Sequence, residues 1–104
     1  MALKRIVAVG TYDESMDPND IDSFRGEKCQ DWAQHEFSGT FVLNEGGTWL
    51  ELEGEESKVN NEVRALLDSG FFVRLTVTDE MMISSKRLED VYTYYSDRDP
   101  ITSL

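Results

Sequence analysis

The sequence contains a single cysteine, Cys29, and a single histidine, His35. One cysteine excludes a disulfide within the chain, which is typical of proteins from a reducing compartment. We therefore expect a cytoplasmic location. The same scarcity excludes the structural zinc sites that are assembled from several Cys and His ligands.

Long hydrophobic runs are also missing. No stretch approaches the roughly 18 apolar residues that a membrane-spanning helix needs. The apolar run near the start, Ile6-Val7-Ala8-Val9, is too short for a signal peptide. We expect the protein to have no membrane partner.

Basic residues are scarce. Ten Lys and Arg stand against 21 Asp and Glu, which gives a formal net charge of −11. Residues 13–56 hold 13 acidic side chains against two basic ones, so this stretch alone accounts for −11. A concentrated anionic surface repels nucleic acid and attracts cationic protein surfaces. Because aromatic residues make up 11% of the chain, we expect a folded domain rather than an acidic disordered tail.

Catalytic and metal-binding motifs are absent. No Ser or Cys stands in a recognised nucleophile arrangement with His35. A calcium loop that began at Asp17 would need a glycine at its sixth position and a glutamate at its twelfth, but Asp22 and Lys28 stand there. The frame that begins at Asp20 also fails. We therefore predict no enzymatic activity, no cofactor and no metal.

Hydrophobic periodicity predicts four strands and two helices. The strands are expected over 3–9, 40–44, 48–53 and 71–78, and the helices over 27–37 and 55–69. The order β-α-β-β-α-β is that of a ferredoxin-like α+β sandwich with two layers, built as one domain over 1–104. Residues 10–26 lack periodicity and are interpreted as a long acidic loop after the first strand.

The C-terminal extension, 81–104, gives two conflicting signals. Ser85 is a suitable helix cap, and Leu88, Val91 and Tyr95 would lie on one helix face. The run Val91-Tyr92-Thr93-Tyr94-Tyr95 instead has strong strand propensity. We prefer the helix, with a strand as the alternative.

One face of such a sheet is left uncovered by helices. Strand alternation places Trp49, Glu51 and Glu53 on this open face, together with Phe72 from a later strand. The open face and the acidic loop together supply the candidate partner-binding residues: Asp13, Glu14, Asp17, Asp20, Asp22, Trp49, Glu51, Glu53 and Phe72.

These features lead to one main hypothesis. Carboxylates on a small domain can imitate nucleic-acid phosphates, so we predict an inhibitor or nucleic-acid mimic that occupies a basic surface of a nucleic-acid-binding protein. Small acidic anti-defence proteins of phages are the analogous class; direct nucleic-acid binding is not expected. The alternatives are a homodimeric assembly subunit that pairs through the open sheet face, and a small-ligand binder or enzyme built around Trp49, Glu51 and Arg74 on that face.

Overall fold

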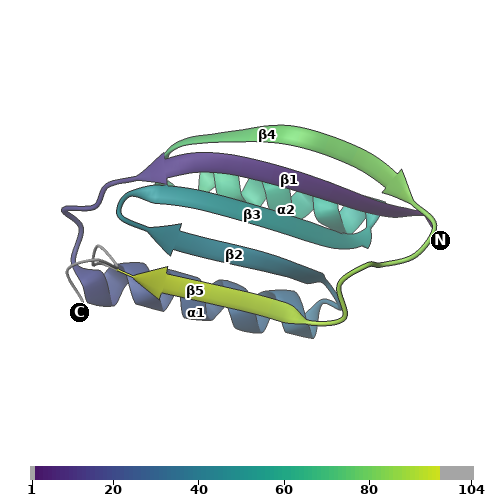
Figure 1. Cartoon of the computed structure of the whole chain (residues 1–104), viewed down its shortest axis with the longest axis horizontal. Coiled ribbons are helices and arrows are strands. Elements are labelled where there is room, and N and C mark those ends of the chain that lie inside the picture. Colours follow the sequence, from purple (N-terminus) through teal and green to yellow (C-terminus); the bar gives the residue numbers. More distant parts are fainter. Residues whose placement is uncertain (1, 97–104) are drawn as a thin grey trace.

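The computed structural model describes residues 2–96. Seven elements follow one another along the chain (Figure 1). They are β1 (Leu3–Tyr12), α1 (Pro18–Gln34), β2 (Ser38–Asn44), β3 (Gly47–Glu55), α2 (Glu56–Asp68), β4 (Phe72–Ile83) and β5 (Val91–Ser96). The predicted order β-α-β-β-α-β and the ferredoxin-like α+β class are confirmed, with β5 added at the end.

The strands form one five-stranded sheet in the order β4-β1-β3-β2-β5. All neighbours are antiparallel except β2 and β5, which are parallel. Both helices lie behind the sheet in Figure 1, with α2 behind β1 and β3 and α1 behind β5. Residues 2–96 therefore place no helix on the other face of the sheet.

The hydrophobic core lies between the sheet and the helices. Alternate residues of the central strands point into it, as the period of two in a strand requires. From the strands these are Ile6, Ala8, Phe41, Leu43, Leu50 and Leu52, and from the helices Ile21, Trp32, Val59 and Leu66, all less than 2% exposed. Phe24 and Phe71 stack beside them with ring centroids 4.0 Å apart.

Helix α1 begins nine residues earlier than expected. The prediction of a long acidic loop over 10–26 is wrong, because β1 continues to Tyr12 and α1 starts at Pro18. The carboxylate of Asp17 accepts a hydrogen bond from the backbone N–H of Asn19 at 2.8 Å and caps the helix. Proline at the first helical position costs no hydrogen bond there, so Asp17-Pro18 is a local start signal for α1.

The C-terminal extension forms a strand, so the helix that we preferred for it is wrong and the strand alternative is confirmed. Strand β5 pairs with the edge of β2, where Tyr94 lies beside Val42 and Tyr92 beside Thr40. The Tyr and Thr residues of β5 favour a strand, and the edge of β2 supplies hydrogen-bond partners for its backbone. The last part of the predicted extension, 97–104, lies outside the described residues.

Candidate functional site

An apolar row crosses the open sheet face. Val9 of β1 is the register partner of Trp49 of β3, Trp49 that of Val42 of β2, and Val42 that of Tyr94 of β5. Directly paired residues project from the same face, so these four side chains lie next to one another. Trp49 is 39% exposed and Tyr94 54%. The predicted position of Trp49 on the open face is confirmed.

Phe72 does not belong to this face. Its ring packs against the core rings of Phe24, Phe41 and Phe71, at centroid distances of 5.9, 6.3 and 5.0 Å. The register of β1 and β4 shifts between Thr11 and Tyr12, which leaves Val73 as the extra residue. Because such an irregularity reverses the alternation of side chains, the strict period of two assigned Phe72 to the wrong face.

Glu51 and Glu53 lie on the open side of β3, but they are not exposed. Glu53 is 0% exposed, because the segment 84–90 between β4 and β5 covers it. Its carboxylate accepts hydrogen bonds from the backbone N–H of Arg87 at 3.1 Å and of Leu88 at 2.8 Å. The hydroxyl of Ser38 donates a further, longer bond of 3.4 Å.

Glu51 is bound by two guanidinium groups. Its Oε1 lies 2.7 Å from an Nη of Arg87 and 3.6 Å from Nε of Arg5. Glu51 is 6% exposed, so it offers almost no free carboxylate to a partner. The alternative of a ligand site around Trp49, Glu51 and Arg74 is weakened as well, because Glu51 is already paired with Arg5 and Arg87.

Three of the five acidic residues between β1 and the first turns of α1, Asp13, Asp17 and Asp22, have local roles. Asp13 accepts hydrogen bonds from the hydroxyl of Ser15 at 2.6 Å and from its backbone N–H at 2.9 Å. These bonds, the hydroxyl one first, lower the pKa of Asp13 below its usual value of 3.8. Asp17 caps α1, and Asp22 pairs with Arg25 at 2.7 Å.

The acidic residues do not form one surface. Asp13, Glu14, Asp17, Asp20 and Asp22 are exposed around the start of α1, in the helical layer. Glu51 and Glu53 are enclosed on the opposite face of the sheet. The expectation of a basic protein partner stays a prediction, which would now have to rest on the α1 side alone.

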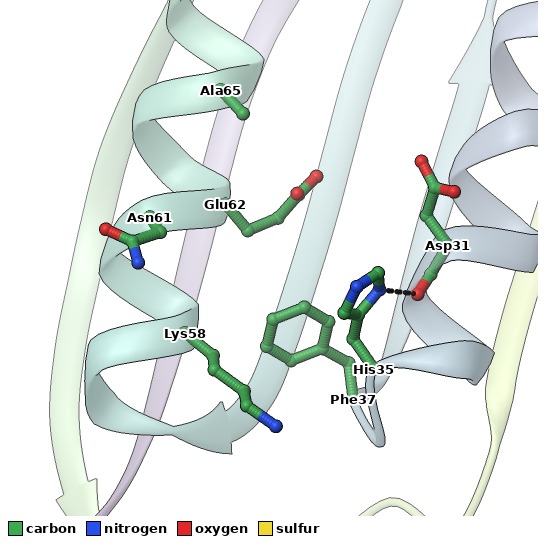
Figure 2. A pocket seen from close by; sticks show the side chains of 7 residues that line it. All are labelled: Asp31, His35, Phe37, Lys58, Asn61, Glu62 and Ala65. Atoms are coloured by element: carbon green, nitrogen blue, oxygen red, sulfur yellow. Dashed lines mark hydrogen bonds between the residues drawn. The ribbon is translucent and has the colours of Figure 1, made fainter.

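A cleft of about 370 Å³ opens between the two helices (Figure 2). It is lined by Asp31, His35, Phe37, Lys58, Asn61, Glu62 and Ala65. In Figure 2 the side chain of Glu62 points from α2 toward α1. Nδ1 of His35 lies 2.7 Å from the carbonyl oxygen of Asp31, and since a carbonyl only accepts, this nitrogen donates.

Sequence reasoning did not find this cleft. Its residues come from the end of α1, the turn after it and the side of α2 near α1, and no motif joins them. Within residues 2–96, no group of three Asp, Glu, His or Cys is placed to hold a metal ion. None of the helices formed by these residues has the length and apolar character to cross a membrane.

Comparison with solved structures identifies the fold. A bacterial light-regulated adenylyl cyclase superposes with a TM-score of 0.82 at 15% identity, over 94% of this chain and 29% of that one. BlrB, a BLUF protein in its dark state, superposes with a TM-score of 0.81 at 15% identity, over 90% of this chain and 73% of BlrB. Klebsiella pneumoniae BlrP1 with FMN and cyclic diGMP superposes with a TM-score of 0.78 at 13% identity, over 91% of this chain and 26% of BlrP1. No family model and no curated protein sequence matches the chain.

The chain thus spans less than a third of the adenylyl cyclase and 64% of a second BlrP1 structure named for its BLUF part. The prediction of an acidic inhibitor or nucleic-acid mimic of phage type is wrong, because the structural neighbours are BLUF domains of light-regulated proteins. The burial of Glu51 and Glu53 removes part of its physical basis as well, since enclosed carboxylates cannot imitate phosphates. The fold of this chain is the fold of a BLUF domain.

Proposed function

We propose that this chain is a non-enzymatic association domain with a BLUF-type fold, and that two copies of it pair through their open sheet faces. The observation that carries the proposal is the apolar row Val9–Trp49–Val42–Tyr94, which runs across four adjacent strands. Its most exposed member is the aromatic Tyr94, and Tyr92 at 55% exposure widens the row on β5. Tyr and Trp are the residues that most often anchor protein interfaces.

The face is large enough for a stable interface. The molecule measures 45 by 28 Å across the view of Figure 1, in which the open side of the sheet faces the reader. A standard interface covers roughly 800 Å² on each partner. A pairing centred on Trp49 therefore needs only part of this face.

The distribution of charge also favours a second copy on this face. Two molecules with a net charge of −11 repel each other, so they should meet where each carries least free charge. The apolar row contains no charged residue, and the neighbouring Glu51 is neutralised by Arg5 and Arg87. The exposed acids at the start of α1 would point away from the partner. A twofold contact is self-complementary, so the same row serves both copies.

Sedimentation velocity over a concentration series tests this proposal. Wild type should be a dimer, and Trp49→Glu and Tyr94→Glu should be folded monomers, because each would bury an unpaired carboxylate in the interface. Leu67→Glu is the matched control: Leu67 is 54% exposed on α2, and its replacement should leave the dimer intact.

Salt gives a second readout. Screening reduces the repulsion between two anionic copies, so added salt should strengthen a dimer that is held by apolar contacts. Added salt would instead weaken a contact with a basic partner, because it screens the attraction between opposite charges. A wild type that stays monomeric at every concentration and salt level overturns the proposal. The single cysteine leads us to place this association in the cytoplasm.

A further inference from the structure

The two helices are separated on the sheet and are joined only by side chains. Within the described chain, no Cα atom of α1 lies within 8 Å of a Cα atom of α2. The space between α1 and α2, next to the cleft lined by Asp31 and Glu62, is the interhelical slot. In Figure 1, α2 lies behind β1 and β3, and α1 lies behind β5. Such an interhelical space above a sheet is a common place for a small organic ligand.

In this chain the slot is filled by Trp32. Its side chain is 0% exposed, and its ring lies 5.7 Å from that of Phe41 on the sheet. The indole N–H donates a hydrogen bond of 3.0 Å to Oε2 of Glu62 on α2. Lys28, one turn before Trp32, donates to the same oxygen at 3.0 Å. The indole and this ion pair connect α1 to α2 at one point.

The remaining cleft does not suit FMN, the molecule named with the structural neighbour BlrP1. FMN needs a flat apolar slot for three fused rings, polar partners for its imide edge and cationic groups for its phosphate. The indole occupies the apolar part of the space, and the inward-pointing Glu62 already accepts two hydrogen bonds. Of the charged side chains around the cleft, Asp31 and Glu62 are anionic and Lys58 alone is a fixed cation.

From this mismatch we infer that Trp32 is a permanent occupant of the interhelical slot, supplied by the chain itself, and that the domain folds and works without a flavin. The inference is independent of the proposed dimer, because Trp32 and the apolar row lie on opposite sides of the sheet. A domain whose slot is filled in this way has no site for a flavin to enter while the indole is present.

The first test is flavin binding by the wild type. The protein should purify without flavin absorbance and retain neither FMN nor riboflavin in equilibrium dialysis. Copurification of a flavin, or saturable retention of either compound with one site per chain, overturns the inference.

The second test uses indole as the probe. Trp32→Ala should leave a buried apolar cavity of indole shape, and cavities of this kind bind small aromatic molecules. Added indole should then raise the Tm of Trp32→Ala by roughly 5 °C, because ligands that bind only the folded state stabilise it. Trp49→Ala is the matched control, since its indole is exposed, and its Tm should not respond to indole.

Each remaining result is also decisive. A folded Trp32→Ala variant that responds to indole no more than Trp49→Ala does shows that the indole fills no slot, which overturns the inference. If Trp32→Ala does not fold, Trp32→Phe replaces it, because phenyl retains most of the filling and loses only the bond to Glu62. This variant should be folded and less stable than wild type, because it loses the bond to Glu62; a stability equal to that of wild type would overturn the inference.

Discussion

Oε1 of Glu53 accepts a hydrogen bond of 2.8 Å from the backbone N–H of Leu88, 35 residues further along the chain. The carboxylate is fully enclosed, and it also accepts the backbone N–H of Arg87. It therefore satisfies two donors in a segment that has no helix or strand of its own. Lys86 of the same segment donates to the carbonyl oxygen of Glu36. These bonds hold the connection from β4 to β5 against the end of the sheet.

Glu53→Gln should destabilise the domain by about 2 kcal/mol, because the charge-assisted bonds from Arg87 and Leu88 are weakened and an amide N–H₂ is placed against donors. Chemical denaturation measures this as a lower midpoint at an unchanged m-value. The control is Glu27→Gln on the exposed side of α1, which should change stability by less than about 0.5 kcal/mol. Equal losses in the two variants would show that the enclosed carboxylate has no special role.

Asp17→Ala should cost about 1 kcal/mol, since the variant loses the side-chain oxygen that caps α1. Asp17→Ser should recover most of the loss, because a serine hydroxyl accepts the same backbone N–H. Thermal unfolding followed by circular dichroism compares the three proteins. The cap would have no energetic role if Asp17→Ala unfolded at the same temperature as wild type.

Alanine should have opposite effects at two glycines. A Cβ on Gly26, inside α1, meets no heavy atom within 4 Å, so Gly26→Ala should stabilise the domain by about 1 kcal/mol through helix propensity. A Cβ on Gly10 would lie 2.1 Å from the carbonyl oxygen of Arg74, so Gly10→Ala must displace backbone and should cost about 2 kcal/mol. Melting temperatures that move in the same direction for both variants would contradict this prediction.

Ser15→Ala should raise the pKa of Asp13 toward 3.8, because the hydroxyl bond of Ser15 is the main cause of its lowering. A carboxylate with a lowered folded pKa stabilises the protein above its unfolded pKa and loses this effect as the pH falls through the folded pKa. Its contribution is thus present above about pH 3.8 and lost below it. Carboxyl-carbon NMR titration measures the shift, and Ser23→Ala, at an exposed position of α1, should leave the pKa of Asp13 unchanged.

Local patterns were sufficient for most of the fold. The alternation in β2 and β3, the apolar stripe of α2 and the element order could all be predicted, because neighbouring residues alone produce the periods of strand and helix. The early start of α1 was also encoded locally, in Asp17-Pro18. It was missed because the acidic residues around this pair were interpreted as a loop.

The candidate site depended on contacts that no local pattern contains. Glu51 and Glu53 look solvent-facing in the alternation of β3, and only the return of residues 84–90 over the sheet encloses them. Phe72 lies on the face opposite to the predicted one, because the register of β1 and β4 shifts at Tyr12. Trp32 lies in the helix predicted over 27–37, and its bond to Glu62 exists only because α2 lies opposite it.

The sequence by itself determined the order of the first six strands and helices, since this order follows from short-range hydrophobic periodicity. It also determined the net charge of −11. The tertiary structure decided which of those charges are free and which apolar residues are exposed, because burial depends on segments that are distant in the chain and meet only after folding. This placement made Asp17 a helix cap, enclosed Glu51 and Glu53, and left an uncharged row on the open face of the sheet.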